Sequence, residues 1–165
     1  MRTIGARGLF YRVADPTWKN PLDTSFAAAI GGRWNPVGLG ALYLNATRSA
    51  ALANARRAIF ARWGRALEDL RPEALPDLQH VDVSAGGVYL DARSPDGIAE
   101  LGLPATFPIG VPHPPCQALG AAAAAAGLDG VSPLSAVAPT QGELVVFDRS
   151  VTQLITRRER VPYPW

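Results

Sequence analysis

Short apolar runs separated by glycine and proline predict several strands along the chain. The clearest are 8–13, 41–44 and 143–147, where aromatic and aliphatic residues follow one another. Shorter alternating runs at 80–83 and 87–91, with a turn between them, predict a β-hairpin. Helical stretches do not alternate regularly with these strands, so the pattern predicts an α+β fold.

Two alanine-rich stretches predict the main helices. The first begins after Thr47, a suitable N-cap, and continues to about Arg65. The second covers 116–127 and ends at Gly127, a residue suited to a C-cap. Residues 16–30, which contain Pro16 and Pro21, predict an irregular connection with an apolar segment at its end.

The first helix has two different faces. Leu52, Ile59 and Trp63, joined by Ala55, recur at helical spacing, and we expect that face to pack on the core. Asn54 falls nearly opposite it, among Ala50, Ala58 and Ala61. A polar side chain among such small neighbours either lines a pocket or faces water.

Composition limits the class of protein. The chain has 165 residues, of which 48% are hydrophobic and 18% charged, as expected for a single globular domain over 1–165. The longest apolar run, 121–126, is too short to cross a bilayer, and no leader segment follows Met1, so we expect a cytoplasmic protein. A single cysteine, Cys116, excludes an internal disulfide, and with only two histidines the chain offers no spaced metal cluster.

Charge gives little indication of nucleic-acid binding. The formal net charge is +2, and the one basic cluster, Arg157, Arg158 and Arg160, is interrupted by Glu159. With little aromatic interleaving, this cluster is more typical of a solvated helix or tail than of a phosphate track. Nor does a GxGxxG sequence follow any predicted strand, so a Rossmann site for a dinucleotide is excluded.

Candidate binding residues lie near two of the predicted strands. Gly31 and Gly32 shape a tight loop that presents Arg33, whose planar guanidinium suits phosphate or carboxylate, although a surface arginine on a turn is the simpler interpretation. Arg12 lies in the middle of the first strand, where it points either to solvent or into a polar pocket. Ser135 follows an Asp-Gly turn, where a serine commonly hydrogen-bonds nearby backbone.

Three separated motifs resemble the RES-domain family, the toxin components of bacterial toxin–antitoxin pairs. The string GGRWNPxGxxALYL at 31–44 resembles the family's opening motif, and Tyr11-Arg12-Val13 resembles its first strand. The passage from Asp129-Gly130 through a serine to an apolar strand ending at Phe147 resembles its C-terminal half. Ser135 takes the place of the family's named serine, with Ser132 as a rival.

The resemblance implies an ADP-ribosyltransferase-like fold, with small antiparallel sheets around a cleft and flanking helices. It implies NAD as the substrate, cleaved between nicotinamide and ribose, and no metal. Arg33 and Arg12 would then hold the pyrophosphate, Tyr43 would pack on nicotinamide or ribose, and Ser135 would hydrogen-bond phosphate or ribose. The expected partner is a helix-turn-helix antitoxin, and a homo-oligomer is left open.

Asn54 stands where the family has its named glutamate. The candidate catalytic residues are therefore Arg33, Tyr43, Asn54 and Ser135, without the carboxylate that would stabilise positive charge on the ribose. Asparagine can hold a ribose hydroxyl, but losing such a charge costs roughly two to three powers of ten in rate. No other carboxylate has a spacing that recommends it, as judged for Asp15, Asp23, Glu68 and Asp69.

Two functions of different classes remain open from the sequence. One is an NAD-acting toxin, working as a glycohydrolase, a phosphorylase or an ADP-ribosyltransferase. The other is a catalytically inactive relative that serves as a nucleotide-binding or protein-binding module, which explains Asn54 directly.

Overall fold

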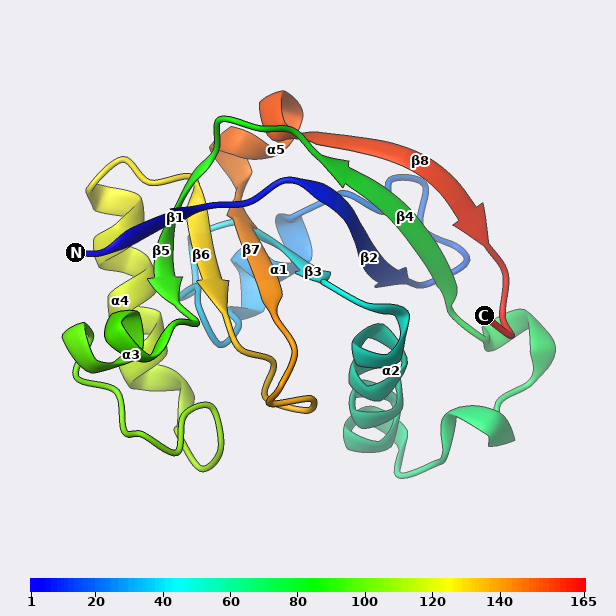
Figure 1. The fold of residues 1–165 in the computed structure, drawn as a ribbon. Helices are drawn as coiled ribbons and strands as arrows, with labels where there is room; N and C mark the ends of the chain where they lie inside the picture. The colour runs from blue at the N-terminus through cyan, green and yellow to red at the C-terminus, as the bar shows by residue number, and fades with distance from the viewer.

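Eight strands and five α-helices make up the computed structural model, which describes residues 1–165 (Figure 1). The strands are β1 Thr3–Gly5, β2 Gly8–Ala14, β3 Ala41–Asn45, β4 Asp77–Val83, β5 Val88–Ala92, β6 Gly130–Pro133, β7 Glu143–Phe147 and β8 Ile155–Val161. The α-helices are α1 Ser25–Ile30, α2 Arg48–Trp63, α3 Pro95–Glu100, α4 His113–Ala125 and α5 Asp148–Leu154. Two short 3₁₀ turns, η1 Leu67–Asp69 and η2 Pro72–Ala74, follow α2.

The strands form one sheet in the order β1-β5-β6-β7-β3-β2-β4-β8. All neighbours are antiparallel except β5 and β6, which run parallel. The predicted α+β class is confirmed, but one continuous sheet stands where two small antiparallel sheets were expected. The sheet is weakest between β2 and β3, which are joined by a single residue pair, Tyr11 with Asn45. Figure 1 shows β2, β4 and β8 bending away from the other strands beyond that point.

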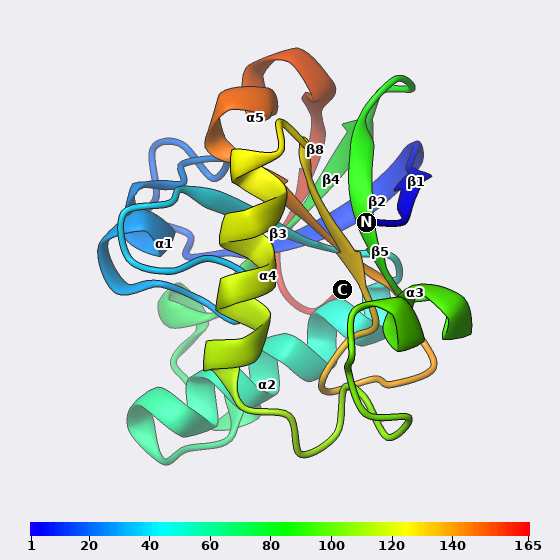
Figure 2. The ribbon, with the colours of Figure 1, turned by 90° about the vertical axis from the view of Figure 1, so that its left-hand side faces the viewer.

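Alternation along the central strands produces a core on each face of the sheet. On β3 and β7, Leu42 and Leu144 point to one face, while Ala41 and Val145 point to the other. The second face is covered by α4, which contributes Cys116 and other small residues (Figure 2). The first face is covered in part by α5. The loop that carries Arg33 is held between α4 and the sheet.

The predicted first helix is confirmed as α2, with Thr47 accepting a hydrogen bond from the backbone N–H of Ala50 and Gly64 as a left-handed C-cap. Its expected core face is confirmed in part, because Ala55 is buried and Leu52 and Ile59 are half-buried, but it is wrong for Trp63. The buried residues are Ala50, Ala51 and Ala55, whereas Trp63 is 45% exposed. Small side chains in its first turns let the helix approach the sheet closely there, whereas Trp63 at its end stays exposed.

Two further expectations are wrong. The predicted hairpin does not form, because β4 pairs with β2 and β8, and β5 pairs with β1 and β6. The basic C-terminal cluster lies on the edge strand β8, where Arg160 pairs with Asp77 at 2.6 Å and Arg158 pairs with Asp82. Charged side chains on an edge strand discourage pairing with other chains.

Smaller differences concern helix boundaries and missed elements. The predicted second helix begins three residues earlier, at His113, as α4. The connection expected at 16–30 contains α1, and the sequence pattern also missed β1, α3 and α5. None of the helices has the length and apolar character needed to cross a membrane.

Candidate functional site

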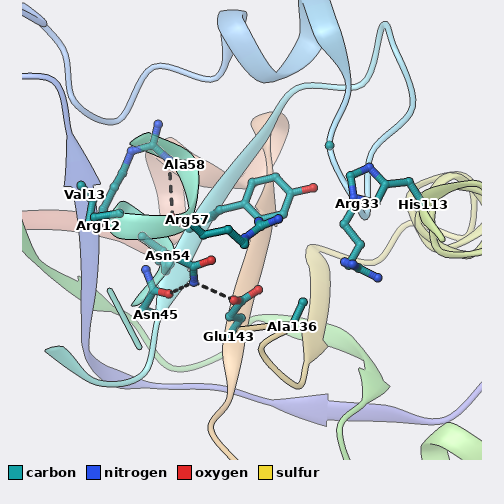
Figure 3. A pocket seen from close by; sticks show the side chains of 14 residues that line it. Arg12, Val13, Arg33, Asn45, Asn54, Arg57, Ala58, His113, Ala136 and Glu143 are labelled. Atoms are coloured by element: carbon teal, nitrogen blue, oxygen red, sulfur yellow. Dashed lines mark hydrogen bonds between the residues drawn. The ribbon is translucent and has the colours of Figure 1, made fainter. Parts of the chain in front are cut away.

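A cavity of about 370 Å³ lies where β2 and β3 separate (Figure 3). Small-molecule sites span about 300–1,000 Å³, so this cavity lies at the lower end of the range for a small-molecule site. The cavity exists because the strands pair only at Tyr11 and Asn45, and because the small residues of α2 cover the gap without filling it. Its lining comes from several elements: Arg12, Val13, Gly32, Arg33, Tyr43, Leu44, Asn45, Asn54, Ala55, Arg57, Ala58, His113, Ala136 and Glu143.

Three arginines from three different elements line this cavity. Arg12 comes from β2, Arg33 from the glycine loop and Arg57 from α2. The structure therefore brings together both arginines predicted from the sequence, and it adds Arg57, which the sequence reasoning missed. Three permanent cations around one cavity favour an anionic ligand.

Arg12 is half-buried, and its guanidinium is held by backbone oxygens. Its Nη2 donates to the carbonyl of Asp23 at 3.3 Å and its Nη1 lies 3.5 Å from the carbonyl of Tyr43. Burial lowers the pKa of Arg12 to about 10, and the charge of Asp23 opposes that shift. The guanidinium remains protonated at neutral pH, and its buried Nε has no hydrogen-bond partner. An unpaired buried donor of this kind is suited to a ligand oxygen.

Arg33 connects the glycine loop to the start of α4. Its Nη1 donates to the carbonyl of Val111 at 2.7 Å, and Gln117 of α4 donates to the carbonyl of Gly32 at 2.8 Å. His113, the first residue of α4, lines the same part of the cavity. Its pKa is lowered by burial and by the nearby charges of Arg33 and Arg57, so it is neutral at pH 7.

Tyr43 braces the loop that presents Arg33. Its hydroxyl accepts a hydrogen bond from the backbone N–H of Trp34 at 2.9 Å and donates to Oδ1 of Asn35 at 2.7 Å. Burial raises the pKa of the Tyr43 hydroxyl, so it stays protonated. Gly32 is required beside it, because a Cβ at Gly32 would lie 2.5 Å from the Tyr43 hydroxyl. The ring still lines the cavity, but the hydroxyl is used by the loop.

Asn54 points into the cavity, toward a carboxylate that the sequence reasoning missed. Its Nδ2 donates to Oε1 of Glu143 at 2.9 Å and to Oδ1 of Asn45 at 2.7 Å (Figure 3). Of the two alternatives for Asn54, the pocket position is the one observed. Glu143 begins β7 directly opposite Asn45 on β3. Pairing the strands predicted at 41–44 and 143–147 in that register would have placed Glu143 at the site.

The remaining candidates lie outside the cavity. Ser135 is fully buried, and its Oγ accepts weak hydrogen bonds from the backbone N–H groups of Val137 and Ala138, at 3.4 and 3.3 Å. Ser132 is buried within β6. The structure therefore places Ser135 in a turn, and it is the neighbouring Ala136 that lines the cavity.

The other acidic residues considered from the sequence do not reach the site either. Glu68 is paired with Arg56 at 2.6 Å on the surface, and none of Asp15, Asp23 and Asp69 lines the cavity. No group of three or more His, Cys, Asp or Glu side chains is arranged to bind a metal ion. The cavity therefore combines three cations with a single carboxylate, that of Glu143.

The fold and the cavity define an α+β domain with a cavity lined by three arginines. The family model described as the RES domain matches residues 9–165, so the chain belongs to the RES domain family. It is similar to the MbcT toxin in the crystal structure of the M. tuberculosis MbcT–MbcA toxin–antitoxin complex. The sequence identity is 27% and the TM-score 0.82, over 97% of this chain and 86% of that chain. No curated protein matches the sequence significantly.

Proposed function

We propose that this protein is the toxin of a toxin–antitoxin pair and that its cavity binds NAD and cleaves the bond between nicotinamide and ribose. The observation that carries the proposal is the convergence of Arg12, Arg33 and Arg57 on one cavity beside two amides and a carboxylate. Membership of the RES domain family and similarity to a chain from a toxin–antitoxin complex support the toxin role.

The polar groups of the cavity suit the different parts of a dinucleotide. A pyrophosphate carries two negative charges, which arginine guanidinium groups bind through paired hydrogen bonds. Ribose hydroxyls both donate and accept, so they match the carboxylate of Glu143 and the amide of Asn45. In the proposed binding mode, the phosphates lie toward the arginines and a ribose lies toward Glu143, in a cleft like that of ADP-ribosyltransferases.

Hydrolysis, phosphorolysis and ADP-ribosyl transfer share the first chemical event, loss of nicotinamide. They differ only in the acceptor that then forms a bond to C1′ of the ribose, which is water, phosphate or a protein group. The proposed partner is an antitoxin with a helix-turn-helix DNA-binding domain, which would make the natural assembly a hetero-oligomer.

A binding module without turnover is the second candidate, and Asn54 in place of the family's glutamate favours it. Such a protein would keep the arginine-lined cavity and bind NAD or ADP-ribose without consuming it. The two functions therefore differ in turnover and agree in binding.

Controlled expression in a bacterial host tests the toxin role. We expect induction of the natural chain to stop growth and to deplete cellular NAD before growth stops, whereas Arg33→Ala does neither. Arg71→Ala, an exposed arginine outside the cavity, is the matched control and should behave like the natural chain. Growth arrest with an undiminished NAD pool would contradict the proposal.

A further inference from the structure

We propose that Glu143 is the catalytic carboxylate of this protein and that Asn54 positions it. The inference rests on the proposed NAD cleavage. The family has a negatively charged glutamate where this chain has Asn54. In our proposal Glu143, on β7, supplies that negative charge to the same cavity. In this account Asn54 is part of a working site and not the mark of a disabled one.

The geometry supplies the first argument. Glu143 is paired in register with Asn45 on the neighbouring strand, so its backbone position is fixed by the sheet. Its Oε1 accepts the Asn54 amide at 2.9 Å, and the same amide is held by Asn45 at 2.7 Å. Figure 3 shows the Glu143 side chain directed toward Asn54 within the cavity. The Glu143 carboxylate is therefore held by one side chain, Asn54, which is itself anchored by Asn45, and such a carboxylate is preorganised, as electrostatic catalysis requires.

The charge distribution supplies the second argument. Glu143 is the one carboxylate that lines the cavity, and it forms no salt bridge with Arg12, Arg33 or Arg57. Its hydrogen bond to Asn54 leaves the negative charge in place, because an amide is neutral. The carboxylate can therefore attract a cation that develops on the substrate, while the arginines attract the phosphates.

The step that this arrangement assists is bond breaking at the ribose. The bond between C1′ and the nicotinamide nitrogen breaks, and its electron pair stays on the nitrogen, which leaves as neutral nicotinamide. Positive charge then develops on C1′ and the ring oxygen, next to the Glu143 carboxylate. Water adds its oxygen to C1′ and releases one proton to solvent, so NAD and water give ADP-ribose, nicotinamide and a proton.

Glu143→Gln tests the charge with little change of shape, because the glutamine oxygen can still accept the Asn54 amide. We expect kcat for nicotinamide release to fall by about a hundredfold or more. We expect affinity for ADP-ribose, measured by calorimetry, to change by no more than a few-fold. Glu73→Gln, an exposed carboxylate in η2, is the matched control and should keep full activity.

Two comparisons decide the outcome. If the natural chain and Glu143→Gln release nicotinamide equally, the role of Glu143 is overturned while the proposed function stands. If the natural chain releases none, the proposed function fails and the role of Glu143 fails with it.

Glu143→Asp keeps the charge and should retain more activity than Glu143→Gln. Equal loss in the two variants would also overturn the proposal.

The positioning role of Asn54 has a separate readout. Asn54→Ala removes the side-chain hydrogen bond to Glu143 but leaves the carboxylate in the cavity. We expect kcat to fall by roughly tenfold, with KM for NAD nearly unchanged, because a charge-assisted hydrogen bond is lost without loss of a phosphate contact. A rise in KM at unchanged kcat would show that Asn54 binds the substrate and does not position Glu143.

Discussion

Removing the hydroxyl of Tyr43 tests whether that hydroxyl stabilises the loop that carries Arg33 or takes part in the reaction. In Tyr43→Phe, the backbone N–H of Trp34 loses its acceptor and Oδ1 of Asn35 loses its donor. Both residues are fully buried, so water cannot easily replace the hydroxyl. A buried polar group left without a partner costs about 1–3 kcal/mol.

From the two orphaned groups we expect the free energy of unfolding to fall by about 2–4 kcal/mol. For a domain of this size that corresponds to a fall in Tm of about 5–15 °C. Urea unfolding followed by tryptophan fluorescence measures the first quantity, and calorimetry measures the second. Because Asn35 also donates to the carbonyls of Ala27 and Leu39, we expect the loop to stay in place at moderate temperature.

Tyr89→Phe is the matched control for this experiment. The Tyr89 hydroxyl is also buried, but it has no hydrogen-bond partner, so its removal should leave stability unchanged or slightly higher. If Tyr43→Phe is as stable as the natural chain yet loses its turnover of NAD, the hydroxyl acts on the substrate and the reasoning about the loop is refuted.

Two further predictions concern the packing and the pH response of the site. Gly120→Ala would place a Cβ 1.8 Å from the carbonyl oxygen of Trp34, so α4 must shift. Overpacking of this kind should cost about 3 kcal/mol and lower Tm in a thermal melt, and an unchanged Tm would contradict the close approach. Affinity for ADP-ribose should increase as pH falls through the lowered pKa of His113, because the imidazole then gains a charge beside Arg33 and Arg57. Titrations of His113→Gln should lack this increase, and an equal increase in the variant would assign it to another group.

The local pattern of the sequence predicted elements better than their pairing. The strands at 8–13, 41–44 and 143–147 and the helix after Thr47 are all present, because apolar runs and caps are local signals. The prediction of a hairpin is wrong because β4 pairs with β2 and β5 pairs with β1, not with each other. Such long-range pairing depends on the whole set of strands, and neither run encodes it alone.

The site, too, was predicted only where a local sequence signal marked its residues. Arg12 and Arg33 were identified from a motif, and the structure places both at one cavity. Glu143 was missed because its position depends on the register of β7 against β3, and Arg57 because a surface arginine on a helix carries no special signal. Ser135 matched the motif, yet its hydroxyl is used by its own turn.

Release of nicotinamide from NAD by the purified protein tests the central claim most directly. The reaction is followed over time by chromatography, with water alone, with added phosphate and with added host protein as the acceptor. The account predicts steady release by the natural chain under at least one condition, and release reduced by about a hundredfold or more in Glu143→Gln. No release under any condition, from a protein that still binds ADP-ribose, would contradict the account and identify a binding module.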